Sequence, residues 1–481
     1  MSAEAAAVRA SPRPPRSRAG AGMAPLATGL VIGAVVALLS VFGVRAQVLA
    51  ALVIALPVPV LLMFLLRPVL AFGLYLAVLP VVLDAPFAEG LNAGEMLTLG
   101  MMALTPVALW SHRQQAVPAL RSLLPIVLPL VALAVLSVAS ILANGVGDAQ
   151  EIISAVVKML AFAAVPVLVY MVADRPERVR LLVQAILLGG TAVAVYSIVA
   201  YLAGWSYSAQ YDWNRAHGTF ENWNQLGGFM VLVSMPTLAL ALSPGSNTRR
   251  MSFGLMFVLQ VVALLLSSTL GSLVALLAGG AVAMLFLFRV RWSAVLASVV
   301  LFLIGFATVY FTNPLLQDKL TRIDERVLDR LMTYAVGWSM MRDQFWFGFG
   351  SQSRVTDALR YGDADYGLTI FGHASAIPHN SFLLMGVEKG ILGLLLFAAL
   401  VLGALLVLLR RRRALLASRR AVLYQGIVVG GLAFLIQNMT NNLILHARIG
   451  ILFLSLVALT ARLGEEAAEP GAESERAGAH G

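Results

Sequence analysis

A histidine near residue 380 has a sequence position that suits proton transfer. It lies in the tetrapeptide Pro378-His379-Asn380-Ser381, directly before an apolar run that is long enough to cross a membrane. An unperturbed imidazole has a pKa of about 6.5, so His379 could accept a proton from a hydroxyl nucleophile. A polar residue at this place could equally cap the helix that follows. The sequence alone leaves both interpretations open.

A group of arginines before this histidine could bind an anion. Arg322, Arg326 and Arg330 are spaced by four residues, so they share one face of a predicted helix. Acidic residues lie among them, and one interpretation is therefore a solvated helix with internal ion pairs. Arg330 differs because it begins an aromatic run that continues to residue 349, and such a helix can lie on a membrane surface. Arginine is also the side chain best matched to bidentate phosphate binding.

A second polar segment, RAHGTFENWN at residues 215–224, also comes just before an apolar run. Arg215 could contact an anion, and the neighbouring His217 could assist it. The residues of this segment predicted to bind substrate are His217, Gly218, Asn222 and Asn224. The alternative is a re-entry turn in which an asparagine caps the next helix.

Several classes of site have no signature in the sequence. There is no HxxxH, HExxH or Asp-rich pattern, so no metal site is predicted. There is no GxxxxGK[ST] loop, and Gly348-Phe349-Gly350 more often marks a tight turn than a phosphate site. The absence of cysteine excludes thiol chemistry. No cofactor is therefore expected, and the energy of any reaction must come from an already activated donor.

The composition predicts an integral membrane protein. Hydrophobic residues make up 60% of the 481 residues and charged residues only 12%, whereas a soluble globular chain carries about 25% charged residues. The net charge of +10 does not indicate nucleic-acid binding, because most basic residues fall at helix ends, where they set the topology of a protein whose expected partners include membrane lipids. A span needs about 20 mostly apolar residues. The sequence thus predicts an all-α polytopic fold with about 12–14 transmembrane helices, at or near residues 25–44, 47–66, 68–83, 95–110, 123–143, 152–173, 178–203, 225–242, 251–267, 270–288, 292–312, 381–409, 420–440 and 443–462.

The basic loops predict the orientation. With the N-terminus in the cytoplasm, the loop arginines lie inside, as the positive-inside rule requires; they include Arg67, Arg113, Arg175, Arg249, Arg289 and the block Arg410 to Arg413. Both termini are then cytoplasmic and the long polar segment 313–380 is outside. Several arginines break the rule on the outer face, mainly within residues 215–228 and 313–380. Arginines on the outer face, where the positive-inside rule disfavours them, suggest an anionic partner on that side.

The polar segments also predict the domain boundaries. Residues 1–22 and 463–481 are expected to be disordered cytoplasmic tails. Transmembrane helices occupy 23–312, with a short outer loop at 204–224, and again 381–462. The outer segment 313–380 is the candidate functional centre, because a long segment on a rigid scaffold often carries the function.

At these residues the sequence resembles the family of O-antigen ligases and O-antigen polymerases of the bacterial envelope. Three motifs match in order: the R-x-x-G-T-F-x-N-x-N loop at 215–224, the run Arg330…Trp338…Gly348-Phe349-Gly350, and His379-Asn380-Ser381-Phe382…Glu388-Lys389-Gly390…Gly393. The resemblance covers roughly residues 200–395 and the many-helix layout of the rest.

The resemblance implies a reaction and its site. It implies a helical glycosyltransferase of the inner membrane, with its active site facing the periplasm. It also implies a glycan donor on undecaprenyl diphosphate and metal-independent, inverting transfer to a glycan or lipid A core acceptor. By residue, Arg215 and Arg330 would stabilise the departing diphosphate, where charge develops. His379 would orient or deprotonate the acceptor hydroxyl and Asn380 would hold His379; Arg326 is a further candidate substrate contact.

One departure from the family pattern bears on the substrate. Many members carry a Ser-Arg-Gly element where this chain has Ser268-Thr269-Leu270-Gly271-Ser272, so one possible diphosphate contact is missing. This favours a polymerase of exopolysaccharide or O-antigen repeats, with a ligase and a transferase to protein hydroxyls as alternatives. The rival from another class is a flippase for lipid-linked sugars. It is disfavoured because a transporter is expected to hold mid-membrane charges and to show two related halves.

Overall fold

The computed structural model of the chain describes residues 67–82, 86–88, 91–103, 112–144, 149–208, 213–282, 321–350 and 378–468, with single positions between 300 and 320 and at 361. The predicted spans near 25–44 and 47–66 lie outside the described residues, as does most of the span near 292–312.

The described chain is helical, which confirms the predicted all-α fold class. Its helices are α4 (Pro68–Val78), α5 (Ala93–Ala103), α7 (Arg113–Ala143), α8 (Ala149–Val172), α9 (Pro176–Leu202), α10 (Trp223–Leu242), α11 (Asn247–Leu266), α12 (Leu270–Val282), α15 (Ile323–Asp343), α17 (Ser381–Leu409), α18 (Arg412–Ala417), α19 (Ala421–Gln437) and α20 (Ala447–Ala468). Two short antiparallel hairpins pair β1 (Pro86–Ala88) with β2 (Leu91–Asn92) and β3 (Tyr207–Ser208) with β4 (Trp213–Asn214).

Seven helices among the described residues are long and apolar enough to cross a membrane. They are α7, α8, α9, α10, α11, α17 continued through α18, and α20, while α4, α12 and α19 are shorter apolar helices. The predicted end of the last span is wrong, because α20 continues past residue 462 to Ala468. The added turn is held because the Glu465 carboxylate bonds to side chains of α7 and α8, as described below.

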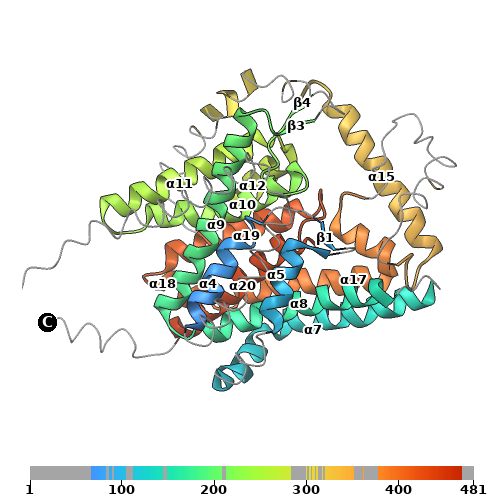
Figure 1. The fold of residues 1–481 in the computed structure, drawn as a ribbon, viewed down its shortest axis with the longest axis horizontal. Helices are drawn as coiled ribbons and strands as arrows, with labels where there is room; N and C mark the ends of the chain where they lie inside the picture. Colours follow the sequence, from blue (N-terminus) through green and yellow to red (C-terminus); the bar gives the residue numbers. More distant parts are fainter. Residues whose placement is uncertain are drawn as a thin grey trace, which may run out of the picture.

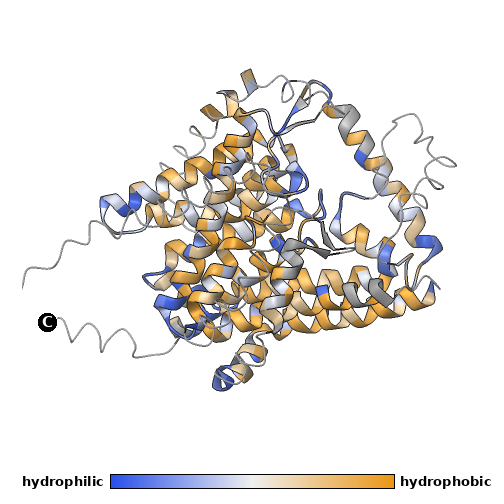
Figure 2. Ribbon diagram, viewed as in Figure 1, coloured by the Kyte–Doolittle hydropathy of each residue, from blue (hydrophilic) through white to orange (hydrophobic). Residues whose placement is uncertain are grey.

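The helices pack into one bundle with a continuous apolar core. Within it α10 packs against α11 and α19, α7 packs against α8 and α17, and α20 packs against α8. Figure 1 shows α15 along one side of the bundle and α18 with the C-terminus at the opposite side. The bundle is coloured as hydrophobic in Figure 2, and hydrophilic residues gather around α18 and recur along α15. A small apolar cluster of Val336, Met340 and Val387 holds α15 on α17.

Helix α17 is interrupted near its first third by Gly390, whose φ of 67° and ψ of −165° are not helical. The turn after α15, residues 344–350, packs into this interruption. The amides of Phe349 and Gly350 donate to the carbonyls of Val387 and Glu388, both at 2.9 Å, and Ile391 N donates to Phe345 O at 2.7 Å. The broken helix is therefore stabilised by a neighbouring turn that supplies the missing backbone partners.

The predicted tight turn at Gly348 and Gly350 is confirmed. Both residues have positive φ, 64° and 94°, in the range that favours glycine. A Cβ on Gly348 would lie 2.4 Å from the backbone of Glu388 and Lys389, so the close approach to α17 requires glycine. Ser140 on α7 fixes the same turn, because its hydroxyl donates to Phe347 O at 2.6 Å.

Candidate functional site

Arg330 lies on α15 and faces the chain that joins α19 to α20. Its Nη1 donates to the carbonyl of Thr440 at 2.5 Å. One turn later on the same helix face, the Tyr334 hydroxyl lies 2.9 Å from Met439 O and 3.3 Å from His379 O. Burial raises the pKa of Tyr334, so the phenol stays protonated and can donate to these carbonyls. Tyr334 thus links Arg330 to the residue predicted as the base.

His379 lies directly before the N-cap of α17. The N-cap is Asn380, whose side-chain oxygen accepts from Phe382 N at 2.9 Å and Leu383 N at 3.1 Å. His379 is therefore not the cap of this helix, which removes that interpretation. The side-chain oxygen of Asn380 therefore already accepts two hydrogen bonds from the first turn of the helix. Half-buried His379 lies just outside the first turn, beside Tyr334.

The chain between α19 and α20, residues 438–446, forms a polar connection that we call the asparagine loop. Asn438 Oδ1 accepts from Leu443 N at 3.1 Å and Ile444 N at 2.8 Å, which closes the loop on itself. It also accepts from Ser381 Oγ at 2.9 Å. Asn442 Nδ2 donates to Pro378 O at 2.9 Å. The loop therefore fixes both the start of α17 and, through Thr440, the side chain of Arg330.

Sequence analysis missed the asparagine loop. The predicted spans at 420–440 and 443–462 left almost no room for it, whereas α19 ends at Gln437 and α20 begins at Ala447. The signal was the string NMTNN between two apolar runs, which has four polar residues in five. Asparagine and threonine favour local side-chain bonds to the backbone over helix continuation.

Arg215 lies on the other polar segment and is buried. Its Nε and Nη2 donate to the carbonyl of Ser267 at 3.1 and 2.9 Å, and Nη2 also reaches Ser268 O at 3.2 Å. Its guanidinium stacks on the ring of Trp223 with 3.9 Å to the centroid. The turn it contacts joins α11 to α12, and its Ser268 has a positive φ of 49°. Arg215 therefore stabilises an unusual backbone turn.

The α11–α12 turn lies between Arg215 and the asparagine loop that binds Arg330. A Cβ on Gly271, at the start of α12, would lie 3.0 Å from Thr440 Oγ1 in the asparagine loop. Gln437 Nε2 donates to Ser272 Oγ at 2.5 Å. The α11–α12 turn thus has Arg215 on one side and the asparagine loop with Arg330 on the other. It is also the stretch that departs from the family pattern at Leu270.

The other predicted residues of the 215–224 segment make local contacts. Asn222 is the N-cap of α10 and accepts from the amides of Asn224 and Gln225, as the re-entry alternative requires. His217 Nδ1 lies 2.9 Å from Phe220 O. Gly218 has φ of 62°, and a Cβ there would lie 2.4 Å from Ser197 Oγ. These residues shape the loop that carries Arg215. Arg326 lies on α15 one turn before Arg330.

Arg448, at the start of α20, holds this loop from the other side. Its Nη1 donates to Thr219 O at 3.0 Å and to Val82 O at 2.5 Å, and its guanidinium lies 4.7 Å from the Phe220 ring centroid. Arg448 is 5% exposed. It therefore acts as a positioning residue for residues 218–220, a role that sequence analysis did not assign.

Replacing Arg448 with methionine is expected to lower the free energy of unfolding by about 2–4 kcal/mol, because one buried and one half-buried carbonyl lose their donor. Thermal unfolding in detergent would measure the loss. Arg250→Met is the matched control, since Arg250 is an exposed arginine on α11. Equal melting temperatures for the two variants would show that Arg448 does not hold the loop.

His446 is a second histidine directly before a long apolar helix, because it immediately precedes α20. Its ring lies 3.2 Å from Gln225 Nε2. Burial, with the nearby charges of Lys158 and Arg448, lowers the pKa of His446 to about 3. The ring is therefore neutral at physiological pH and packs as a polar core residue.

Within the described residues, no group of three or more His, Asp or Glu side chains is arranged to hold a metal ion. The arginines supply the positive charge of this site. The site can thus offer cationic and amide donors to an anionic group, next to a histidine and several backbone carbonyls.

The comparisons with known proteins point to one family. A family model described as O-antigen ligase matches residues 255–398. The matched region contains Arg330, the turn at Gly348–Gly350 and His379, while Arg215 lies before it. A comparison with curated proteins finds no match. The stretch that matches the O-antigen ligase family model thus contributes Arg330, Tyr334 and the start of α17 to this site.

Proposed function

We propose that the protein is a glycosyltransferase of the bacterial inner membrane that acts at the periplasmic face. It moves a glycan from undecaprenyl diphosphate to a hydroxyl acceptor. One observation carries the proposal: Arg330 and the start of α17, far apart in sequence, are tied to the same asparagine loop. A cation and a candidate base are thereby held at one end of the bundle.

In this mechanism the acceptor hydroxyl attacks the anomeric carbon of the donor sugar. The bond from that carbon to the diphosphate oxygen breaks with inversion, and the electron pair leaves with the diphosphate. His379 takes the proton of the attacking hydroxyl. Arg330, with Arg215 behind the α11–α12 turn, lowers the energy of the negative charge on the leaving group. The reaction as proposed needs no metal and no cofactor.

The proposed orientation follows from charge. The block Arg410 to Arg413 follows the end of α17 distant from His379. If the positive-inside rule applies, this block and both termini are cytoplasmic, and the site faces the periplasm. The substrates are then a lipid-linked donor from the outer leaflet and a periplasmic acceptor.

His379→Ala is expected to lower transfer by about 10²–10⁴-fold while donor binding is kept, since a general base contributes that much. Transfer is measured with the purified protein and a lipid-diphosphate glycan, and donor binding is measured separately. His112→Ala, at the N-cap of α7, is the control. Undiminished transfer by the His379 variant would remove its proton-transfer role.

Deleting the gene and profiling surface glycans together with lipid-linked intermediates tests the function and separates its versions. Single lipid-linked repeats without long chains would identify a polymerase, the version we favour because Leu270 replaces the family arginine. Long lipid-linked chains beside bare lipid A core would identify a ligase. Loss of glycan from protein alone would identify a protein transferase. Repeats trapped in the cytoplasmic leaflet would identify a flippase and overturn the proposal.

A further inference from the structure

A second polar site lies at the end of the bundle distant from His379. After the interruption at Gly390, residues 391–409 of α17 form a helix about 28 Å long, close to the thickness of the hydrocarbon core of a bilayer. At its far end a pocket opens between α7, α17, α18 and α20. Six of its lining residues matter here: Ser122, Val407, Arg410, Arg411, Leu415 and Glu465.

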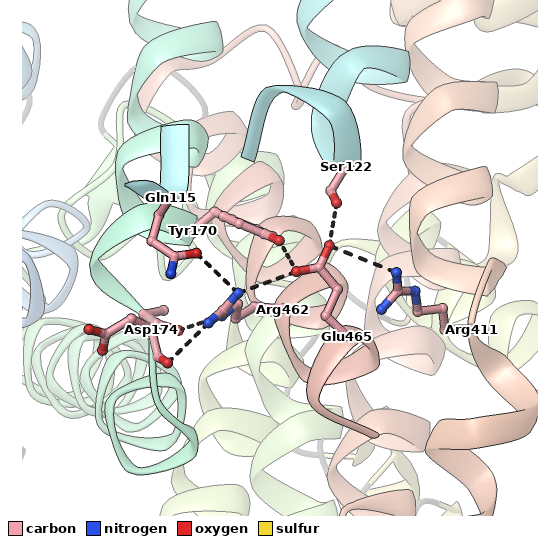
Figure 3. Close-up of polar contacts among 8 residues, drawn as sticks. Gln115, Ser122, Tyr170, Asp174, Arg411, Arg462 and Glu465 are labelled. Carbon is pink, nitrogen blue, oxygen red and sulfur yellow. Dashed lines mark hydrogen bonds and ion pairs between the residues drawn. The ribbon is translucent and has the colours of Figure 1, made fainter. Parts of the chain in front are cut away.

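The one carboxylate in the pocket is already compensated. Glu465 accepts from Ser122 Oγ at 2.5 Å and from the hydroxyl of Tyr170, and it pairs with Arg462 at 3.3 Å (Figure 3). Arg411 lies 3.9 Å from the same carboxylate on the pocket side. Arg462 is fixed in turn by the carbonyls of Ala173 and Asp174. Glu465 therefore contributes little net negative charge to the pocket.

The arginines of the wall give the pocket a positive potential. Arg410 is exposed at its edge, and exposed Arg412 and Arg413 follow it. Basic pockets between membrane helices favour anionic headgroups, and arginine offers phosphate a bidentate contact. An anionic phosphate group therefore complements the charge of this pocket.

An apolar stripe leads from the membrane to the same arginine. Leu395, Leu402 and Leu406 on α17 are 56%, 60% and 62% exposed. Leu402, Leu406 and Arg410 are spaced by four residues, so they follow one helix face. Val407 and Leu415 form apolar wall beside the arginines. The surface therefore fits an amphipathic ligand, with its chain along the leucines and its charge at Arg410.

We propose that this pocket binds one anionic glycerophospholipid, with its phosphate between Arg410 and Arg411 and an acyl chain along Leu402 and Leu406. A lipid bound here would contact the ends of α7, α17 and α20 at the same time. The proposal is independent of the reaction at the other end of the bundle, since its test measures binding alone.

The test uses the full-length protein purified in a neutral detergent. It is offered equal amounts of phosphatidylglycerol and phosphatidylcholine with the same acyl chains, and the lipid that stays bound is counted by native mass spectrometry. Wild-type protein is expected to keep phosphatidylglycerol, and Arg410→Gln to keep about fivefold less, as one lost cation near a membrane surface implies. Arg410 is chosen over Arg411 because Arg411 also pairs with Glu465.

The matched control is Arg419→Gln, an exposed arginine of the same basic stretch that does not line the pocket. It is expected to bind phosphatidylglycerol as the wild type does. An equal loss in the control would mean diffuse charge attraction and would overturn the site. A wild type without preference for phosphatidylglycerol would also overturn it. Complete displacement by inorganic phosphate would show that the acyl chain contributes nothing, and the lipid assignment would fall.

Discussion

Replacing Arg330 with alanine is expected to lower glycan transfer by about 10²–10³-fold, the usual cost of removing one donor that faces developing charge. The physical reason is the position of the guanidinium, which is fixed by its bond to Thr440 O and lies one turn from Tyr334. A preorganised cation does not have to reorient when the diphosphate leaves. Arg330→Lys is expected to recover part of the rate, because lysine keeps the charge but lacks the planar fork.

The matched control for Arg330 is Arg342→Ala, an exposed arginine in the last turn of the same helix. Both variants remove one positive charge from α15, so a difference between them reports position and not net charge. Transfer by the purified proteins and their melting temperatures are measured together. A melting temperature that falls in proportion to activity in Arg330→Ala would make the residue a structural support of the asparagine loop. Equal activity in both variants would remove Arg330 from the mechanism.

Replacing Gly390 with alanine is expected to lower the free energy of unfolding by about 3 kcal/mol or more. The backbone there adopts φ of 67° and ψ of −165°, a region that only glycine occupies readily. A Cβ would also lie 2.4 Å from the carbonyl carbon and oxygen of Trp346 and 2.5 Å from Phe345 O. Since these are backbone atoms of the packed turn, neither the turn nor α17 can move aside cheaply.

Thermal unfolding in detergent measures this loss, with Gly254→Ala as the control. Gly254 lies within α11, and a Cβ there has no heavy atom within 4 Å, so alanine is expected to be neutral or to stabilise by up to about 1 kcal/mol. Unchanged melting of Gly390→Ala would contradict the interruption of α17. Transfer is expected to fall with stability, because the turn that packs against Gly390 follows α15, which carries Arg330.

The sequence predicts most of this bundle because its strongest signals are local. The bounds of α17 are predicted as observed, since Asn380 caps its first turn and the arginine block begins at Arg410. The helix expected at Arg326 and Arg330 is present, although Arg322 lies at its N-cap and not within it. Apolar length and basic flanks are enough to place such elements.

The contacts that organise the site are not readable in this way. Arg448 bonds to Thr219, which is 229 residues away in the chain, and Arg330 bonds to Thr440 across 110 residues. In both bonds the acceptor is a backbone carbonyl. Since every residue has one, no pattern of side chains in the sequence predicts which carbonyl the arginine binds. The interruption at Gly390 is hidden for a similar reason: its partners are main-chain atoms of residues 345–350.

The turn at 344–350 and the start of α17 are both held against the bundle by backbone atoms. Gly350 N donates to Glu388 O, and Pro378 O accepts from Asn442, so positions 350 and 378 are two fixed points. Tyr361, which lies between these two points in the sequence, donates its hydroxyl to Asp343 Oδ2 at 2.7 Å and lies edge-on to the Phe349 ring. A loop graft between positions 350 and 378 therefore has to keep the Tyr361 contact with α15 as well as the two fixed ends.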